Sequence, residues 1–309
     1  MNLKKPKFWD KPKPNFFSFI LIPITIFFKI IVSLKPKNKI KLKNIRTICV
    51  GNIYIGGTGK TSLSIKINDI LTKKNIRTCF IKKFYSNQFD EQRLLKNYGK
   101  LFLANKRIDA LNEAVKENYT VAILDDGLQD YSISYDMSLV CFNTINWIGN
   151  GMTIPSGPLR ESLNKIKNYN NVFLNGANED TLKIEKKILR INPKINIYKG
   201  KYVPTNLNEF NLNSNYLVFS GIGNHETFIS MLKAHKFKII KDLEFSDHYN
   251  YTDKDLGKII NLAKTLNCKI ITTEKDYLRL NQKNNEYVKF IKSELKLEDE
   301  EKLVKVLLN

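Results

Sequence analysis

The stretch that decides the fold reads Thr47-Ile48-Cys49-Val50-Gly51-Asn52-Ile53-Tyr54-Ile55-Gly56-Gly57-Thr58-Gly59-Lys60-Thr61. A β-branched apolar run passes directly into a glycine-rich loop, and apolar residues then recur at helical spacing from Leu63 to Leu71. This order predicts a strand, a phosphate-binding loop and a helix whose positive end faces the loop.

The loop residues are candidates for binding a nucleotide. The three glycines allow backbone N–H groups to turn toward phosphates, Lys60 reaches the terminal phosphates, and the Thr61 hydroxyl is placed to ligate Mg²⁺. The strict motif has glycine where this chain has Tyr54. A glycine-rich turn that binds nothing is the alternative, but Gly-Lys-Thr between a strand and a helix favours a nucleotide site. The predicted nucleotide-binding residues are Tyr54, Ile55, Gly56, Gly57, Thr58, Gly59, Lys60 and Thr61.

Composition indicates a globular chain of about two domains, because 309 residues with 42% hydrophobic content can bury a core. The formal net charge of +21 predicts attraction to an anionic partner: nucleic acid, an acidic lipid surface or a polyphosphate. A general lysine bias also places many of these charges on ordinary solvated faces. The four cysteines are widely separated, which indicates neither a metal site nor a disulfide framework and is typical of a reducing compartment.

The N-terminal run Phe16 to Leu34 is strongly apolar and has lysine-rich segments on both sides. Its length is close to the ~20 residues of a membrane-spanning helix, but Pro23 and Lys29 interrupt it. No small-residue cleavage site follows, which argues against a signal peptide. The first 50 residues carry 12 Lys/Arg against one acidic residue, Asp10, so we favour a helix in the interface of an anionic membrane. A spanning helix and a buried core helix remain alternatives.

Strand and helix patterns then alternate, which predicts a parallel α/β domain: strands at 77–81, 120–124 and 138–142, and a helix at 108–117. Asp125 and Asp126 end one of these strands, where nucleotide-binding sheets place the carboxylate that holds Mg²⁺. Asp-Gly is also an ordinary turn. Arg160 and Glu161 follow a Gly-Pro turn, where Arg160 either caps a helix or braces a transferring phosphoryl group.

The second half restarts the alternation after an extended segment. A charged helix is expected at 179–190, strands at 172–174, 216–219, 238–243 and 269–272, and helices at 226–233 and 253–266. We therefore expect a phosphate-loop NTPase-like parallel-sheet domain with a second, smaller α/β domain and an N-terminal membrane-interface helix. The expected divisions are a membrane-associating segment at 1–44, the phosphate-loop domain at 45–194, a linker at 195–214 and the smaller domain at 215–309.

Taken in order, the motifs of the chain resemble those of the tetraacyldisaccharide 4'-kinases. They are Val50-Gly51-Asn52, Gly56-Gly57-Thr58-Gly59-Lys60-Thr61, Asp90-Glu91, Leu124-Asp125-Asp126-Gly127-Leu128-Gln129, Gly157-Pro158-Leu159-Arg160-Glu161, Phe219-Ser220-Gly221-Ile222-Gly223-Asn224, Asp247-His248-Tyr249 and Thr272-Thr273-Glu274-Lys275-Asp276. They cover most of the chain, and the family's phosphate loop also lacks the glycine at the position of Tyr54.

The resemblance implies an ATP- and Mg²⁺-dependent kinase that phosphorylates the 4'-hydroxyl of an acylated glucosamine disaccharide in lipid A synthesis. Such an enzyme acts as a peripheral protein at the cytoplasmic face of the bacterial inner membrane. The expected partners are ATP, the acylated disaccharide lipid and an anionic membrane surface. No nucleic acid is expected, since no recognition helix or zinc motif is present. The resemblance assigns Lys60 and Arg160 to the phosphates, and Thr61, Asp125, Asp126 and Glu161 to the metal.

Asp90 and His248 are the expected proton-accepting pair. The family's Asp-Glu pair supplies its base, and the histidine that matches His248 works with that aspartate. An acceptor hydroxyl benefits from a carboxylate that takes its proton as the phosphoryl group arrives. The alternative for Asp90 is a cap of the helix that begins near Glu91.

Two departures from the family pattern concern how the nucleotide or the acceptor is held. Lys82-Lys83-Phe84-Tyr85 replaces the usual Ser-Arg-Gly-Tyr, and Asp130 stands where a histidine usually follows the Asp-Asp-Gly-x-Gln motif. Other interpretations of the chain are a kinase of a small soluble metabolite, a membrane-associated phosphate-loop ATPase and a nucleotide switch that transfers nothing.

Overall fold

The computed structural model describes residues 5–33, 39–85, 88–176, 181–280 and 286–308. The chain divides into two compact units. The phosphate-loop unit comprises Lys4–Phe84, Leu95–Lys201 and Leu297–Asn309, and the second unit comprises Tyr85–Leu94 and Tyr202–Lys296. Leu34, the expected end of the apolar run, and Glu179, within the expected charged helix, lie outside the described residues.

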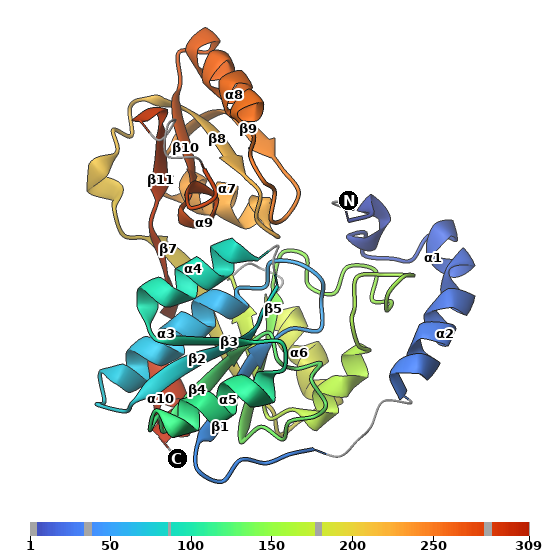
Figure 1. The fold of residues 1–309 in the computed structure, drawn as a ribbon. Coiled ribbons are helices and arrows are strands. Elements are labelled where there is room, and N and C mark those ends of the chain that lie inside the picture. The colour runs from blue at the N-terminus through green and yellow to red at the C-terminus, as the bar shows by residue number, and fades with distance from the viewer. Residues whose placement is uncertain (1–4, 34–38, 86–87, 177–180, 281–285, 309) are drawn as a thin grey trace. The chain divides into compact units, whose positions relative to one another are not determined.

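The strands of the phosphate-loop unit belong to an eight-stranded sheet with the order β12-β7-β6-β5-β1-β4-β2-β3 (Figure 1). All pairings from β7 to β3 are parallel. The expected parallel α/β fold is therefore confirmed. The strands are β1 (Arg46–Gly51), β2 (Thr78–Lys83), β3 (Leu101–Ala104), β4 (Val121–Asp125), β5 (Met137–Asn143), β6 (Asn171–Asn175), β7 (Asn196–Pro204) and β12 (Ser293–Leu297).

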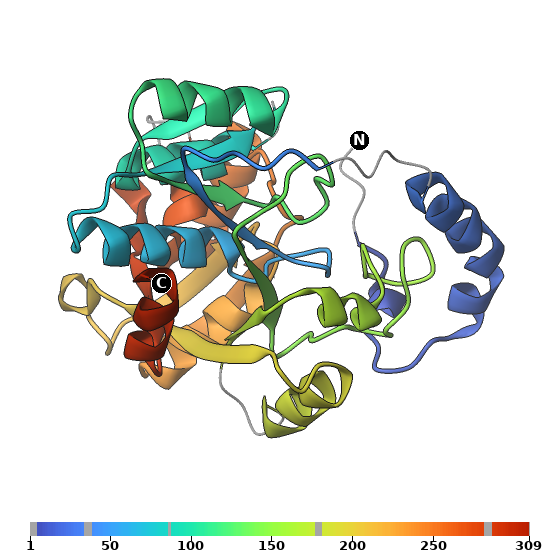
Figure 2. The ribbon, with the colours of Figure 1, turned by 90° about the horizontal axis from the view of Figure 1, so that it is seen from below.

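The helices from the N-terminus to α6, and the C-terminal helix, are α1 (Phe16–Ile20), α2 (Ile22–Ser33), α3 (Lys60–Thr72), α4 (Phe89–Tyr98), α5 (Arg107–Lys116), α6 (Thr181–Ile191) and α10 (Glu300–Leu308), with short 3-10 helices η1 (Lys7–Trp9) and η2 (Leu163–Asn168). Helix α3 packs on β1, β2 and β4, and α5 packs on β2 and β3. The C-terminal helix α10 lies beside α3 (Figure 2), where Lys66 Nζ is 2.8 Å from Glu300.

The central strands are buried along nearly their whole length, as expected for parallel strands that are covered on both faces. Ile48, Cys49 and Val50 of β1 are fully buried, and so are Ile123 and Leu124 of β4. Their carboxyl ends meet at the edge of the sheet where the phosphate loop begins, because Val50 is in register with Asp125. Parallel α/β sheets bind their ligands at this edge.

Two parts of the chain differ from the boundaries expected for the domains. The first part of the segment expected to be a linker at 195–214 is strand β7, which pairs with β6. The last residues do not stay with the smaller unit, since Leu297–Asn309 belong to the phosphate-loop unit. Leu303 and Leu307 of α10 are fully buried, and their burial holds the C-terminal helix on the phosphate-loop unit.

The second unit has its own four-stranded sheet with the order β11-β10-β8-β9, and all of its pairings are parallel. A smaller α/β unit is thus confirmed. Its elements are η3 (Leu207–Glu209), β8 (Asn215–Ser220), α7 (His225–Ala234), β9 (Lys238–Glu244), α8 (Asp253–Thr265), β10 (Lys269–Thr273), α9 (Glu274–Tyr277) and β11 (Val288–Ile291).

The N-terminal helices α1 and α2 turn apolar side chains toward solvent. Asn15 and Ser18 form a capping box that starts α1. The exposed residues include Phe16, Phe17, Phe19, Ile20, Ile24, Ile26, Phe27, Phe28, Ile30, Ile31 and Val32. These exposures exclude the buried core helix as an interpretation of the segment. Among the described helices, none is both long and apolar enough to span a membrane.

Candidate phosphate-loop and proton-acceptor sites

The phosphate loop connects β1 to α3 and has the backbone that the glycines predict. Gly59, the N-cap of α3, has a φ of 85°, and Gly56 has a φ of 134°, values that favour glycine over residues with a side chain. Lys60 and Thr61 begin the 13-residue helix α3. The loop therefore ends at a helix N-terminus, where backbone N–H groups are available to an anion.

Asn52 holds the loop in shape from inside. Its side-chain amide donates to the Gly56 carbonyl at 3.2 Å and to Thr58 Oγ1 at 3.1 Å. Asn52 and Thr58 are both buried. The side chain of Thr58, a predicted nucleotide-binding residue, thus helps to hold the conformation of the loop.

A distant segment of the chain lies alongside the phosphate loop. The Ile55 N–H donates to the Pro158 carbonyl at 2.8 Å, the Arg160 N–H donates to the Ile53 carbonyl at 2.6 Å, and Tyr54 and Leu159 form an antiparallel bridge. This pairing brings Arg160 next to the nucleotide site, although it lies about one hundred residues further along the chain.

Asp125 lies at the centre of the candidate metal site. Thr61 Oγ1 is 3.2 Å from Asp125 Oδ2, and Lys82 Nζ is 2.6 Å from the same oxygen. Lys82 is 1% exposed and Asp125 is fully buried. Lys82 thus neutralises the aspartate inside the protein, and the chain pairs the two side chains where β2 and β4 end side by side.

Asp126 and Arg160 form a second ion pair, with Arg160 Nη1 2.8 Å from Asp126 Oδ1. Burial by itself would raise the pKa of Asp126, but the positive charges of Lys60, Arg160 and Lys82 hold that pKa below its ordinary value. Asp126 is therefore a carboxylate among cations, as expected where a polyphosphate and a metal bind together.

Gln129 links Glu161 to the rest of this site. Its amide nitrogen donates to Glu161 Oε1 at 2.9 Å and to the Asn52 carbonyl at 3.0 Å, while its oxygen accepts from Arg160 at 3.1 Å. Gln129 is a residue of the acidic motif that the sequence did not single out as functional. Only its position between three parts of the site reveals its role.

Asp130 serves a structural purpose beside the acidic pair. Arg107 Nη1 is 3.2 Å from Asp130 Oδ2, and Arg107 Nη2 donates to the Asp126 carbonyl at 2.6 Å. Arg107 is buried, so its charge needs this partner. The residue that departs from the family pattern thus supports the backbone that presents Asp126.

Mg²⁺ prefers oxygen ligands and usually takes one or two carboxylates, with phosphate and water completing its shell. Thr61 and Asp125 offer a hydroxyl and a carboxylate at the end of the phosphate loop, which fits this preference. Within the part of the chain that the structure describes, no group of three or more His, Cys, Asp or Glu side chains is arranged to hold a metal. The protein alone therefore provides a partial set of ligands, of the kind that a bound phosphate completes.

Asp90 and His248 meet in the second unit. His248 Nδ1 is 3.0 Å from Asp90 Oδ1, and Asp90 lies in the first turn of α4. The expected domain ranges placed Asp90 in the phosphate-loop domain and His248 in the smaller domain. The structure places both residues in one compact unit.

Two cations hold the second oxygen of Asp90. Arg279 Nη2 lies 2.6 Å and Lys275 Nζ 3.3 Å from Asp90 Oδ2, and Lys275 Nζ also lies 2.9 Å from Glu91 Oε1. Burial would raise the pKa of Asp90, but Lys275, the hydrogen bond to His248 and Arg279 hold that pKa far below its usual range. Asp90 is thus ionised, and Lys275 and Arg279 are functional candidates that only the tertiary structure identifies.

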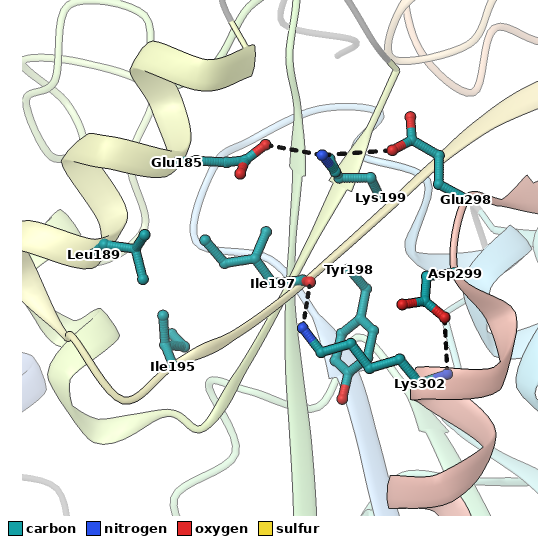
Figure 3. Close-up of a pocket in the computed structure, with 9 residues that line it drawn as sticks. All are labelled: Glu185, Leu189, Ile195, Ile197, Tyr198, Lys199, Glu298, Asp299 and Lys302. Carbon is teal, nitrogen blue, oxygen red and sulfur yellow. Dashed lines mark hydrogen bonds and ion pairs between the residues drawn. The ribbon is translucent and has the colours of Figure 1, made fainter.

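A separate pocket of about 460 Å³ opens between α6, β7 and α10 (Figure 3). Lys199 bridges Glu185 at 3.2 Å and Glu298 at 3.5 Å, and Lys302 donates to the Ile197 carbonyl at 3.4 Å. No predicted nucleotide, metal or catalytic residue lines this pocket. Lys199, Glu185 and Glu298 are already paired with one another, and none of the predicted site residues is present, so this pocket is not the candidate site.

The fold and the phosphate-loop site define a phosphate-loop protein of the kinase and NTPase class. Comparison with known proteins narrows this class. The family model described as "Tetraacyldisaccharide-1-P 4'-kinase" matches residues 17–309, and the chain belongs to this family. The resemblance found in the sequence is therefore confirmed.

Individual relatives agree with this assignment. A "Tetraacyldisaccharide 4'-kinase" of Pelagibacter ubique (strain HTCC1062) is 59% identical and covers 100% of this chain and 98% of its own. A protein of the same name from Rickettsia akari (strain Hartford) is 33% identical over 93% of this chain and 92% of its own. The crystal structure of LpxK from Aquifex aeolicus in complex with ATP has a TM-score of 0.65 at 22% identity, and covers 94% of this chain and 96% of that chain, which confirms the fold.

Proposed function

We propose that this chain transfers the γ-phosphoryl group of ATP to the 4'-hydroxyl of a tetraacylated glucosamine disaccharide 1-phosphate. One observation carries the proposal: the phosphate loop, the Asp126–Arg160 pair and the Thr61–Asp125 pair lie together in one unit. The chain that contains them matches this kinase family over residues 17–309. In such reactions, the protein contributes mainly positioning and charge stabilisation.

The residues from Tyr54 to Thr61 bind the ATP phosphates. Backbone N–H groups at the start of α3 face the anion, and the ammonium group of Lys60 contacts the β- and γ-phosphate oxygens. The guanidinium group of Arg160 adds charge on the other side, where Asp126 and Gln129 hold its orientation. A fixed guanidinium stabilises the charge that develops on the transferring group.

Thr61, Asp125, Asp126 and Glu161 would hold Mg²⁺. When bound, the metal neutralises charge on the β- and γ-phosphates. Lys82 Nζ lies 2.6 Å from the Asp125 carboxylate and holds it in place, and Gln129 fixes the Glu161 carboxylate. These contacts maintain the two carboxylates in place before the nucleotide arrives.

The Asp90–His248 pair accepts the proton of the acceptor. The 4'-hydroxyl oxygen forms a bond to the γ-phosphorus, the bond from that phosphorus to the β–γ bridging oxygen breaks, and the hydroxyl proton passes to Asp90. A carboxylate with a depressed pKa is a weak base, so Asp90 mainly orients the hydroxyl and takes its proton late, when bond formation has made it acidic. His248 orients the carboxylate through their 3.0 Å contact.

The exposed apolar face of α1 and α2 lies in the surface of an anionic membrane. Eleven large apolar side chains are exposed there, and Lys/Arg outnumber Asp/Glu by 12 to 1 in the first 50 residues. Such a face gains free energy from burial at the lipid boundary, and the basic flanks are attracted to acidic lipids. The protein thus acts as a peripheral protein at the cytoplasmic face of the bacterial inner membrane, where an acylated acceptor is available.

A partition assay tests the proposal. The purified chain is incubated with [γ-³²P]ATP, Mg²⁺ and the disaccharide lipid, and the label is measured in the lipid phase and as inorganic phosphate. We expect label in the lipid phase. Label found only as inorganic phosphate would identify an ATPase, and nucleotide binding without either product would identify a switch.

A further inference from the structure

Tyr54 stands where a strict phosphate-loop motif has its first glycine, and its hydroxyl contacts the N-terminal segment. Lys5 Nζ donates to the Tyr54 hydroxyl at 2.6 Å, and this hydroxyl donates to Asp10 Oδ1 at 2.5 Å. Lys5 also lies 4.7 Å from the centroid of the tyrosine ring. Tyr54 is buried. The phosphate loop is thus attached, by its own side chain, to residues that lie 44 or more positions earlier.

The segment is attached a second time through Trp9. The indole N–H of Trp9 donates to the Pro155 carbonyl at 3.1 Å, and the Trp9 carbonyl accepts from the Asn150 N–H at 2.9 Å. A Cβ atom at Gly149 would lie 2.1 Å from this carbonyl oxygen. The close approach of the two backbones therefore requires glycine at that position.

The third attachment is a set of buried polar contacts beneath α1 and α2. Asn150 Nδ2 donates to Ser18 Oγ at 3.0 Å, and the hydroxyls of Thr25 and Ser156 are 2.7 Å apart. Ser18, Thr25 and Ser156 are all buried. The helices therefore present polar side chains to the protein and apolar side chains to the outside, the reverse of an ordinary surface helix.

The loop that receives these contacts continues directly into the strand beside the phosphate loop. Residues 149–157 lead to Pro158 and Arg160, whose backbones pair with Ile55 and Ile53. The N-terminal segment thus touches the two strands of this pairing at different places. It contacts Tyr54 directly, and it contacts the loop that leads to Arg160.

We infer that the N-terminal segment is a positioning element of the nucleotide site, and that the Tyr54–Asp10 contact couples membrane binding by α1 and α2 to ATP binding. This inference rests on the proposed function, because it takes ATP as the ligand of the loop. A bilayer that holds the helices restricts the segment, which keeps Lys5 and Asp10 on Tyr54 and the loop in its binding conformation. Coupling between two ligands is reciprocal. The bilayer therefore increases the affinity of the protein for ATP, and ATP increases its affinity for the bilayer.

The experiment measures the Kd of Mg-ATP for the full chain, with and without vesicles of phosphatidylethanolamine and phosphatidylglycerol that contain no acceptor lipid. Vesicles should lower the Kd of the wild type. Tyr54→Phe keeps the ring and removes the hydroxyl, and Asp10→Asn removes the charge. Because Asp10 is partly exposed, loss of this contact should cost about as much as an ordinary hydrogen bond, which raises the Kd about 3- to 10-fold, and should abolish its dependence on vesicles.

The kinetic pattern separates positioning from general damage. Each variant should raise the KM for ATP and leave kcat nearly unchanged, and the double variant should resemble either single one. Tyr198→Phe is the matched control, since Tyr198 is buried in the same unit and its hydroxyl has no hydrogen-bond partner among the described residues (Figure 3). Vesicle co-sedimentation measured without ATP should be the same for all variants, because their apolar face is intact.

Two results would overturn the inference in distinguishable ways. A folded Tyr54→Phe or Asp10→Asn protein with wild-type ATP affinity in both conditions would reject the coupling and leave the proposed function standing. A wild-type chain that does not bind ATP would reject both. Because Asp10 is more than one-third exposed, its variant should fold even if Tyr54→Phe does not.

Discussion

Lys82 and Asp125 form an ion pair of 2.6 Å in which neither charged side chain is more than 2% exposed. The two residues lie at the carboxyl ends of neighbouring parallel strands. Asp125 also accepts a hydrogen bond from the hydroxyl of Thr61, which follows the phosphate loop. A buried pair is strongly coupled, since removing one partner leaves the other charge without compensation. The pair therefore links the stability of the sheet to the integrity of the candidate metal site.

Lys82→Met should lower the free energy of unfolding by about 3–5 kcal/mol, because it strands the Asp125 carboxylate. Urea unfolding measures the difference. Lys73→Met is the control: Lys73 pairs with Asp69 at 2.8 Å on the surface, and the loss there should be within about 0.5 kcal/mol. Equal stability of Lys82→Met and the wild type would contradict the coupling.

Asp90→Ala and His248→Ala should each reduce kcat by about 10²- to 10⁴-fold, with little change in ATP affinity, since the pair handles the acceptor proton. The double variant should lose much less than the product of the two single losses, because the residues act through one contact. Steady-state kinetics of the four proteins gives the coupling. Fully multiplicative losses would show independent action, and an active Asp90→Ala protein would reduce Asp90 to a residue of the first turn of α4.

The dependence of stability on pH should identify the native charge of Asp90. Lys275, His248 and Arg279 hold its native pKa below the unfolded value of about 3.9. Its contribution is therefore complete above that pH and is lost as the pH falls toward the native pKa. Asp90→Asn should cost about 3–5 kcal/mol at pH 7.

The difference in unfolding free energy between wild type and Asp90→Asn should stay constant from pH 7 to pH 5 and shrink below about pH 4. Denaturant unfolding across this range measures it. A difference that already disappears between pH 7 and pH 5 would mean that the pKa of Asp90 is raised, and that the cations do not govern it.

Vesicle binding should depend on the exposed phenylalanines of the N-terminal helices. Phe16→Ser and Phe27→Ser, at side chains 73% and 62% exposed, should each weaken binding to anionic vesicles by about tenfold or more. Leu182→Ser in α6 is a matched control, since Leu182 is 66% exposed in another helix of the same unit. Equal co-sedimentation of all three variants would show that α1 and α2 do not enter the lipid surface.

Local patterns in the sequence were enough to predict the phosphate loop and the central strands. The Gly59-Lys60-Thr61 turn predicted the start of α3, and β4 and β5 lie within one or two residues of their predicted ranges. These elements are determined by residues next to one another: glycines that allow a left-handed backbone, and apolar runs long enough for a strand covered on both faces.

Local sequence patterns did not reveal the order of the strands in the sheet. Lys82 and Asp125 were both predicted near strand ends, but their ion pair depends on β2 lying next to β4. The polar composition of β7, including Lys199 and Gly200, made it look like a linker, yet it pairs with β6. The contact between Tyr54 and Asp10 likewise depends on how a distant segment packs, which periodicity does not encode.

The position of the transferred phosphate tests the central claim most directly. The wild-type chain and Lys60→Ala are incubated with ATP, Mg²⁺ and the disaccharide lipid, and ADP and the lipid product are quantified, with the site of phosphorylation assigned by ³¹P NMR. The wild type should form one 4'-phosphomonoester for each ADP, and a folded Lys60→Ala protein should be slower by orders of magnitude, since Lys60 holds the phosphates. ADP formed without the 4'-phosphate, or near-wild-type transfer by Lys60→Ala, would contradict the account.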